Sequence, residues 1–352
     1  MSSQSSGQRR GLLGRLAEGP VLCAEGYLFE LERRGYLQAG AFVPEVVLDH
    51  PEEVTQLHRE LVHAGSDVVE AFTYYAHREK LRLVGKEDVL ERLNRQALSL
   101  AKEVAAESGA LFAGNVCNTN VYEPGEPAAY DRVRAMFEEQ VAWAAEAGAD
   151  YVIGETFSYA EEALVALEVI KKAALPAVIT LAVHRAPRTR EGWSVGDACR
   201  QLAGAGADVV GLNCARGPRT MLPLLQEILP AVDVPVAALP VPYRTSQAEP
   251  SFQSLRDPGY PSPPSGIPFP TALDPFTCTR YEIADFTREA LRLGVRYFGL
   301  CCGAGPHHVR SMAEALGRTP PASRYSADMS KHAFLGTDAA LRRHNLDYKD
   351  QL

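Results

Sequence analysis

The chain has 352 residues, of which 46% are hydrophobic and 23% are charged, a balance typical of a globular protein with a large core. Its formal charge of −8 argues against a nucleic acid or an anionic membrane surface as the main partner. No apolar run approaches the ~20 residues that cross a bilayer, and the polar first ten residues lack the apolar stretch of a secretory signal. We therefore expect a cytoplasmic protein in which residues 1–10 form a disordered tail.

A ten-residue sequence pattern recurs along the chain. It reads AGSDVVEAFT at residues 64–73, AGADYVIGET at 147–156, AGADVVGLNC at 205–214 and, more loosely, LGVRYFGLCC at 293–302. Each copy holds a glycine, the residue that commonly ends a helix, and then a short apolar run typical of a strand buried on both faces. The repeated order of helix, glycine and strand predicts a parallel sheet.

Filling the gaps between these copies gives eight strands that alternate with eight helices. The strands are expected at Val21–Gly26, Val68–Tyr75, Leu111–Val116, Tyr151–Phe157, Ala177–Val183, Val209–Cys214, Val234–Val241 and Tyr297–Gly303. The helices are expected at residues 52–64, 88–107, 130–147, 160–173, 195–205, 219–229, 280–293 and 307–317. This count predicts a single (β/α)8 TIM barrel. An open doubly wound sheet is the alternative, although no GxGxxG motif follows the first strand.

Two segments fall outside the repeat. Residues 242–275, after the seventh strand, form a long loop rich in Pro, Ser and Gly, and a loop of this length usually works as a lid or a binding loop. Residues 320–352 carry no barrel strand, and we expect either a C-terminal arm that packs on another subunit or a frayed terminus. The barrel itself is expected to occupy residues 11–319.

Three of the seven cysteines are expected to meet at one end of the barrel. Counting seven or eight residues from the glycine that ends each helix reaches Thr73, Glu155, Cys214, Cys301 and Cys302. These residues share one height at the C-terminal ends of the strands, where barrel enzymes place their active sites. Adjacent cysteines rarely bridge each other, so the alternatives are a metal, a reactive thiol or core packing. Three thiolates with an open fourth position favour a catalytic zinc site.

Three short motifs then carry a resemblance. Residues 25–26 (Glu-Gly), 211–214 (Gly-Leu-Asn-Cys) and 299–303 (Gly-Leu-Cys-Cys-Gly) resemble the homocysteine-binding S-methyltransferase family, a family of zinc-containing barrels. The likeness runs from about Gly11 to Ala322. Blocks such as GLLGRLAEG, FELERRGYLQAG and HPEEVTQLHRELVHAGSD are most similar to the betaine–homocysteine branch of that family.

The resemblance implies a cofactor and a reaction. Zn2+ would be held by Cys214, Cys301 and Cys302, and it would keep the sulfur of homocysteine as a thiolate. The thiolate would take a methyl group from an onium donor, which yields methionine. The three cysteines would thus serve as metal ligands and catalytic residues. Tyr75 would be a further catalytic residue that ligates zinc when substrate is absent.

The resemblance also implies the residues that bind homocysteine. Glu155 would bind its amino group, while Glu25 and Gly26 would hold the amino-acid end. Thr73 and Asn213 complete the expected substrate-binding set.

The methyl donor is expected to lie against aromatic rings, because aromatic faces bind desolvated onium groups by up to about 2 kcal/mol each. The candidates are Phe42, Tyr74, Tyr75 and Phe157.

The sequence departs from the betaine enzymes at four positions. Phe42 stands where they carry Trp, Thr156 where they carry Tyr, Glu25 where they carry Asp, and Ala71 where they carry Thr. We therefore expect a sulfonium or a larger betaine, rather than betaine itself, to be the best donor. The alternatives are a zinc methyltransferase for another thiol and a catalytically altered zinc-binding barrel. A homo-oligomer is expected from the family, with neither nucleic acid nor membrane as a partner.

Overall fold

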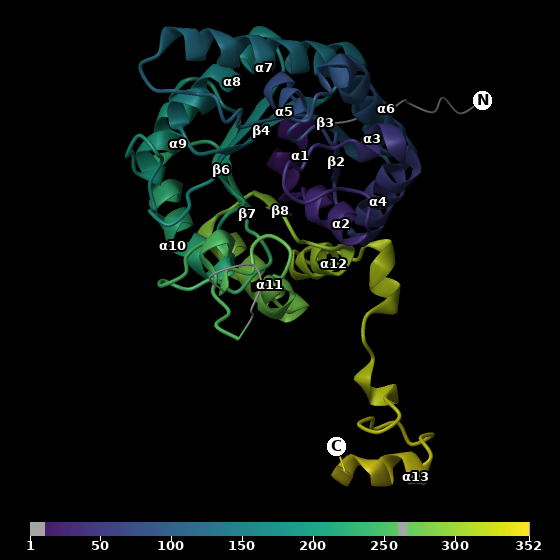
Figure 1. Ribbon diagram of the computed structural model, residues 1–352. Helices are drawn as coiled ribbons and strands as arrows, with labels where there is room; N and C mark the ends of the chain where they lie inside the picture. Colours follow the sequence, from purple (N-terminus) through teal and green to yellow (C-terminus); the bar gives the residue numbers. More distant parts are fainter. Residues whose placement is uncertain (1–10, 260–265, 352) are drawn as a thin grey trace, which may run out of the picture.

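A computed structural model describes residues 11–259 and 266–351 of the chain (Figure 1). Eight parallel strands close into a barrel in chain order, with β1 paired to β8, and helices surround the barrel. This arrangement confirms the predicted (β/α)8 fold and rules out the open doubly wound sheet. The expected tail at residues 1–10 lies outside the described residues.

The strands are shorter than most of the predicted ranges. They are β1 Val21–Ala24, β2 Val68–Glu70, β3 Leu111–Cys117, β4 Tyr151–Phe157, β5 Ala177–Leu181, β6 Val209–Asn213, β7 Val236–Leu239 and β8 Tyr297–Leu300. The sequence prediction extended β2 to Tyr75 and β6 to Cys214, but these two residues have φ angles of 60° and 54°. A residue in this left-handed region interrupts regular strand pairing, as Thr156 does at the register shift in β4, and both Tyr75 and Cys214 lie beyond the ends of their strands.

Twelve α-helices precede the C-terminal segment among the described residues. They are α1 Leu12–Glu18, α2 Tyr27–Arg33, α3 Val46–Asp49, α4 Pro51–Ala64, α5 Arg78–Leu83, α6 Leu90–Ser108, α7 Pro127–Ala147, α8 Ala160–Lys172, α9 Val195–Gly204, α10 Pro218–Ile228, α11 Arg280–Leu293 and α12 Pro306–Ala315. The eight predicted helices correspond to α4 and to α6 through α12. The prediction missed α1, α2, α3 and α5, because two turns or fewer are too short to show a helical period.

The inside of the barrel changes from apolar to polar along the strands. Side chains alternate across a strand, so every second residue points inward. Near the strand starts, the buried inner cluster is apolar, and α1 closes this end with Leu12 and Leu16. Toward the strand ends, the inward alternation continues with polar residues. These are Glu25, Glu70, Asn115, Glu155 and Asn213, all of them buried. The polar end of the barrel interior therefore coincides with the C-terminal ends of the strands.

The long loop after β7 is anchored by an aromatic cluster. Phe252, in a short 3-10 helix at Phe252–Ser254, stacks on Tyr243 with 5.8 Å between ring centroids. Its ring also meets Phe29 of α2 at 6.0 Å and Phe269 at 5.0 Å. The described part of the loop is thus packed onto the C-terminal end of the barrel; residues 260–265 lie outside the described residues.

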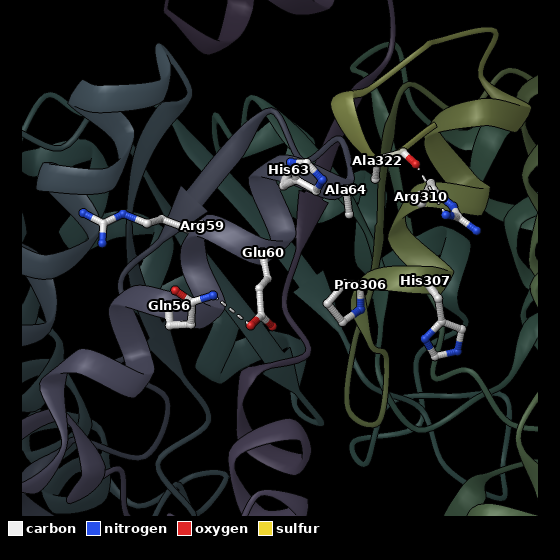
Figure 2. Close-up of a pocket in the computed structure, with 9 residues that line it drawn as sticks. All are labelled: Gln56, Arg59, Glu60, His63, Ala64, Pro306, His307, Arg310 and Ala322. Atoms are coloured by element: carbon white, nitrogen blue, oxygen red, sulfur yellow. Dashed lines mark hydrogen bonds between the residues drawn. The ribbon is translucent and has the colours of Figure 1, made fainter. Parts of the chain in front are cut away.

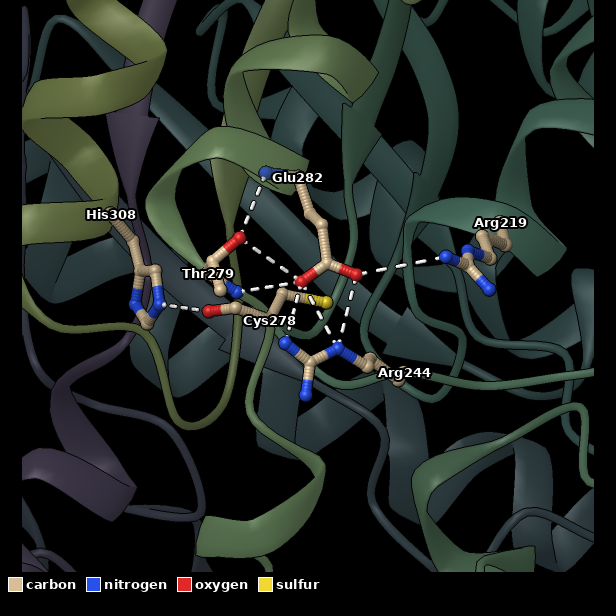
Figure 3. A network of polar contacts seen from close by, with 6 residues as sticks. All are labelled: Arg219, Arg244, Cys278, Thr279, Glu282 and His308. Atoms are coloured by element: carbon tan, nitrogen blue, oxygen red, sulfur yellow. Dashed lines mark hydrogen bonds and ion pairs between the residues drawn. The ribbon is translucent and has the colours of Figure 1, made fainter. Parts of the chain in front are cut away.

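A polar network fixes the point where this loop enters α11 (Figure 3). Arg244 donates hydrogen bonds of 2.8 and 3.0 Å to the carboxylate of Glu282, and the backbone N–H of Thr279 donates another at 2.8 Å. The Arg244 hydrogen bond is the main reason that the pKa of Glu282 falls to about 2. On the other side, His308 Nε2 of α12 lies 3.0 Å from the carbonyl oxygen of Cys278. The network joins the loop to α11 and α12.

Beyond α12 the chain leaves the barrel (Figure 1). It forms short helical segments at Pro321–Tyr325, Met329–Lys331, Arg343–Leu346 (α13) and Asp347–Gln351. Among the helices that the structure describes, none has the length and apolar character that a membrane crossing requires.

Candidate active site

Three cysteine sulfurs meet at the C-terminal end of the barrel. Cys214 directly follows β6, and Cys301 and Cys302 directly follow β8. Their Sγ atoms all lie within 4.8 Å of one another, and those of Cys301 and Cys302 are 3.8 Å apart. Two sulfurs bound to one tetrahedral Zn2+ at about 2.3 Å lie about 3.8 Å apart, so the donor set fits a zinc ion without a large movement.

The backbone around Cys214 is held in a costly conformation. Cys214 and Ala215 have φ angles of 54° and 52°, in the left-handed region that residues with a side chain rarely adopt. Hydrogen bonds hold the segment: the Cys214 N–H donates to the Leu239 carbonyl at 2.9 Å, and the Phe252 N–H donates to the Ala215 carbonyl at 2.8 Å. Strain of this kind persists where the surroundings fix it, and it collects at functional sites.

The three thiols share their protons. Hydrogen bonds from Cys301 and Cys302 hold the pKa of Cys214 well below its ordinary value. The same contacts with Cys214 raise the pKa of both Cys301 and Cys302 well above theirs. The cluster therefore already favours one thiolate, which suits a soft metal cation.

Glu155, at the end of β4, is held by three donors. Its Oε1 accepts a hydrogen bond from Asn115 Nδ2 at 2.7 Å, and its Oε2 accepts from Asn213 Nδ2 at 2.7 Å and from Thr156 Oγ1 at 3.0 Å. Burial raises the pKa of Glu155 to about 7. The Thr156 N–H donates to Asn213 Oδ1 at 2.9 Å and so orients that asparagine. Glu155 and Asn213, both expected in the substrate-binding set, are thus brought together.

Two further carboxylates face the same space. Glu25 follows β1, as the sequence analysis expected, but Glu70 at the end of β2 was not singled out. Burial raises the pKa of both groups well above the ordinary value, and the nearby carboxylate of Glu155 adds to the effect. Asn115 of β3 was also missed; it donates to Glu70 Oε1 at 2.7 Å. The inward alternation along β2 and β3 is the signal that would have found them.

These groups line one small cavity of about 20 Å³. Its walls include Glu25, Glu70, Asn115 and Glu155, together with Tyr74 and two of the three cysteines. A wider cavity of about 540 Å³ lies outside the barrel, between α4 and α12, and is lined by Gln56, Arg59, Glu60, His63, His307 and Arg310 among others (Figure 2). None of the predicted site residues lines that second cavity.

Gly26 and Thr73 have structural reasons for their identity. A Cβ atom on Gly26 would lie 2.5 Å from the carbonyl oxygen of Ala304, so only glycine lets the segment after β1 approach the loop after β8. Thr73 donates its hydroxyl to the Asn115 carbonyl at 2.9 Å and is buried. Its hydroxyl therefore holds β3 beside the cavity.

Tyr74 and Tyr75 form an aromatic pair at the cavity. Their ring centroids are 4.3 Å apart, and the Tyr75 N–H donates to the sulfur of Cys117 at 3.2 Å. The ammonium of Lys80 lies 4.0 Å from the centre of the Tyr75 ring, so this ring already binds one cation. Tyr74 is thus the predicted donor-binding ring that lines the cavity.

The other two aromatic candidates do not line the small cavity. Phe42 meets Phe29 at 5.6 Å between ring centroids and belongs to the cluster that anchors the long loop. Phe157 is fully buried and packs against Phe137 of α7 at 6.0 Å. A register shift between Gly154 and Phe157 turns the end of β4, so the structure does not bring Phe157 to the cavity.

Comparison with known proteins gives a consistent result. A family model described as homocysteine S-methyltransferase matches residues 26–316. Betaine–homocysteine S-methyltransferase 1 of Xenopus tropicalis is 36% identical, over 99% of this chain and 87% of that protein. The S-methylmethionine–homocysteine S-methyltransferase BHMT2 of Mus musculus is 36% identical, over 91% of this chain and 86% of that protein. The metallated homocysteine methyltransferase MmuM of Escherichia coli has the same fold, with a TM-score of 0.66, 19% identity and coverage of 85% of this chain and 98% of that one.

Proposed function

Because the chain belongs to the homocysteine S-methyltransferase family, we propose that this S-methyltransferase moves a methyl group from an onium donor to the sulfur of homocysteine, with Zn2+ held by Cys214, Cys301 and Cys302. The observation that carries the proposal is the convergence of the three sulfurs within 4.8 Å, beside three buried carboxylates. A thiol acceptor needs activation, and an amino-acid acceptor needs a partner for its ammonium group. This site offers both.

The zinc ion would supply an open coordination position at which a thiol is held as its thiolate near neutral pH. The protein's own contribution is placement. Glu155 orients Asn115 and Asn213 through short hydrogen bonds, and the polar groups fix the amino-acid end of the acceptor. Tyr74 lines the cavity, and its ring would help to keep water from the reacting sulfur. Holding both reactants in line is the main source of rate in such a transfer.

We propose a donor with a net positive charge, such as a sulfonium amino acid, in preference to betaine. Three carboxylates and the side chain of Tyr74 line the cavity. Both features favour a cation, whereas betaine is neutral overall. Phe42 and Thr156 also replace the Trp and Tyr of the betaine enzymes. The similar proteins named above include both betaine and S-methylmethionine enzymes, so either donor class is within reach of this fold.

The metal assignment is tested by metal analysis of purified protein. We expect about one zinc per chain in the wild type and a loss of zinc in Cys214→Ala. Cys199→Ala is the matched control, because Cys199 of α9 is also buried and lies outside the cluster. Full zinc occupancy in Cys214→Ala would refute the assignment. Methionine formed from homocysteine and a panel of betaine and sulfonium donors tests the reaction.

We also propose that residues 320–352 form an arm that binds a second copy of the chain. Four large hydrophobic side chains on this segment are exposed: Tyr325, Met329, Leu335 and Tyr348. Exposed apolar groups on a segment that leaves the domain are typical of an interface. Light scattering should report an oligomer for the full chain and a monomer for a chain ending at Ser326; an unchanged mass would contradict the arm.

We also propose a cytoplasmic location, because a reducing compartment suits the seven free cysteines.

A further inference from the structure

The loop between β5 and α9, here called the basic loop (residues 182–194), gathers positive charge at one end of the barrel. Residues 184–190 read His-Arg-Ala-Pro-Arg-Thr-Arg, so three arginines and a histidine stand within seven positions. The loop follows the C-terminal end of β5 at Leu181, at the same end of the barrel as the three cysteines. A local excess of positive charge contrasts with the formal charge of −8 for the whole chain.

The arginines of the basic loop have few partners. In the described part of the chain, no ion pair joins Arg185, Arg188 or Arg190 to another residue. Arg188 donates a hydrogen bond to the carbonyl oxygen of Gly192 at 3.2 Å, and the guanidinium of Arg190 lies 5.2 Å from the centre of the Tyr159 ring. A guanidinium carries five N–H donors, so most of the donors of these side chains are open to a ligand.

Two carboxylates near the basic loop are engaged elsewhere. Glu191, the one acidic residue of the loop, accepts a hydrogen bond from the Glu161 N–H at 3.0 Å, at the start of α8. Asp197, in the first turn of α9, forms an ion pair of 2.5 Å with Arg200. Like charges that stand together without a counter-charge repel one another, so an anion bound at the arginines would relieve this repulsion.

The basic loop lines a pocket with a volume of about 560 Å³. His184, Arg188 and Arg190 line it together with the hydroxyl-bearing residues Ser158 and Thr189, and no acidic residue is among its described lining. Guanidinium and hydroxyl groups are donors that suit the oxygens of a phosphate group. The volume lies in the range of small-molecule sites and leaves room for more than a phosphate alone. The pocket therefore suits a phosphate attached to a small organic molecule.

Hydrogen bonds hold the basic loop in place without a ligand. The Arg190 N–H donates to the carbonyl oxygen of Ser158 at 2.8 Å. The buried guanidinium of Arg216, in the segment after β6, donates to the carbonyl oxygens of Val183 at 3.2 Å and His184 at 2.7 Å. A pocket whose backbone is already fixed loses less entropy when a ligand binds.

We propose that this pocket binds the phosphate group of a small phosphorylated molecule, through Arg188 and Arg190 and the hydroxyls of Ser158 and Thr189. Two arginines balance the roughly two negative charges that a phosphate monoester carries near neutral pH, whereas a carboxylate carries one. The pocket shares no lining residue with the small cavity beside the cysteines, so its ligand is distinct from the methyl acceptor. The inference does not depend on the proposed function.

The carboxylate end of the methyl donor is the competing occupant. An onium donor also carries a positive group, and the arginines that attract its carboxylate repel that group. A phosphorylated molecule without a cationic group meets no such repulsion. The charge of the pocket therefore favours the phosphate.

The test measures binding by calorimetry to the full-length protein, with ribose 5-phosphate, inorganic phosphate and phosphate-free ribose as probes. The variants are Arg188→Gln and Arg190→Gln, and Arg280→Gln is the matched control. The guanidinium of Arg280 in α11 lies 5.7 Å from the centre of the Tyr281 ring, much as that of Arg190 lies over Tyr159, but Arg280 does not line the pocket. Thermal melts check that each variant is folded. Steady-state kinetics give the KM for the methyl donor.

We expect ribose 5-phosphate and inorganic phosphate to bind the wild type and ribose not to bind. Arg188→Gln and Arg190→Gln should each weaken the binding of ribose 5-phosphate by about 10- to 100-fold, because each removes a hydrogen bond between charged groups. Arg280→Gln, which removes the same charge elsewhere, should bind ribose 5-phosphate as the wild type does.

Three results would overturn the phosphate site. The first is that neither phosphate probe binds the wild type, and the second is that all three variants weaken binding equally, which would show a general effect of charge. The third is a rise in the KM for the methyl donor in Arg188→Gln and Arg190→Gln while phosphate binding is unchanged, which would assign the pocket to the donor. The calorimetry needs no turnover, so a failure of methyl transfer would refute the proposed function and leave this test intact.

Discussion

Replacing Glu155 by Gln should damage activity without damaging the fold. The carboxylate accepts hydrogen bonds from Asn115 and Asn213 through different oxygens, each at 2.7 Å. A glutamine keeps one oxygen and presents an NH2 group to the other asparagine, so two donors face each other. Turning Asn115 over would take its donor from Glu70, and turning Asn213 over would break its bond from the Thr156 N–H. No rotation of the amides satisfies all of these groups.

The expected loss is that of one hydrogen bond to a charged acceptor, about 1.5–3 kcal/mol. Expressed as kcat/KM for homocysteine, this is a fall of about 10- to 150-fold. Stability should change little, because the variant also removes a buried charge, which is costly to desolvate. Steady-state kinetics and thermal melts of Glu155→Gln and of the control Glu162→Gln provide the comparison, because Glu162 is also a buried glutamate but accepts its hydrogen bonds from Thr119, away from the cavity. A kcat/KM within threefold of the wild type, or an activity loss that follows a large drop in Tm, would refute this reasoning.

The remaining predictions concern the metal loop, acid stability and the donor. Gly303→Ala should lower zinc occupancy, because Gly303 has a φ of +92° and a Cβ there would lie 2.1 Å from the hydroxyl of Tyr243. Gly317 also has a positive φ, of +80°, but a Cβ there would have no atom within 4 Å, so the control Gly317→Ala should keep its zinc. Burial lowers the pKa of His58 to about 3, so between pH 6.5 and 3 the unfolded chain binds a proton that the folded chain refuses. Stability is therefore kept above pH 6.5 and lost as the pH falls. Between pH 7 and 5, the free energy of unfolding in urea should fall by about 2 kcal/mol less in His58→Phe than in the wild type, and an equal fall in both would contradict the assignment. Phe42→Trp combined with Thr156→Tyr should raise the use of betaine relative to a sulfonium donor; an unchanged ratio in a donor panel would show that these positions do not select the donor.

The barrel could be predicted from the sequence because its signal is periodic. A glycine that ends a helix fixes where the next strand begins, and a buried strand has a nearly constant length. Counting from that glycine therefore places Cys214, Cys301 and Cys302 at one height. The structure brings their sulfurs within 4.8 Å of one another.

The parts that could not be predicted depend on local departures from that period. The register shift in β4 moves Phe157 away from the cavity, and no sequence pattern marks it. Short helices such as α2 lack the length to show a period. Glu70 and Asn115 were accessible in principle, since they continue the inward alternation of β2 and β3. They were missed because a lone polar residue in an apolar strand does not reveal what it faces.

The charges of the site favour ligands that carry a cationic group. Three cysteines and three glutamates converge at one end of the barrel, and no Lys or Arg is among the described residues that line the cavity. Such a group of buried acids cannot stay ionised alone, and burial does raise the pKa of Glu25, Glu70 and Glu155. A zinc ion, an ammonium and an onium methyl group would each supply positive charge where it is lacking. The same imbalance disfavours acceptors and donors without a cationic group, so the selectivity and the chemistry of the site have one physical origin.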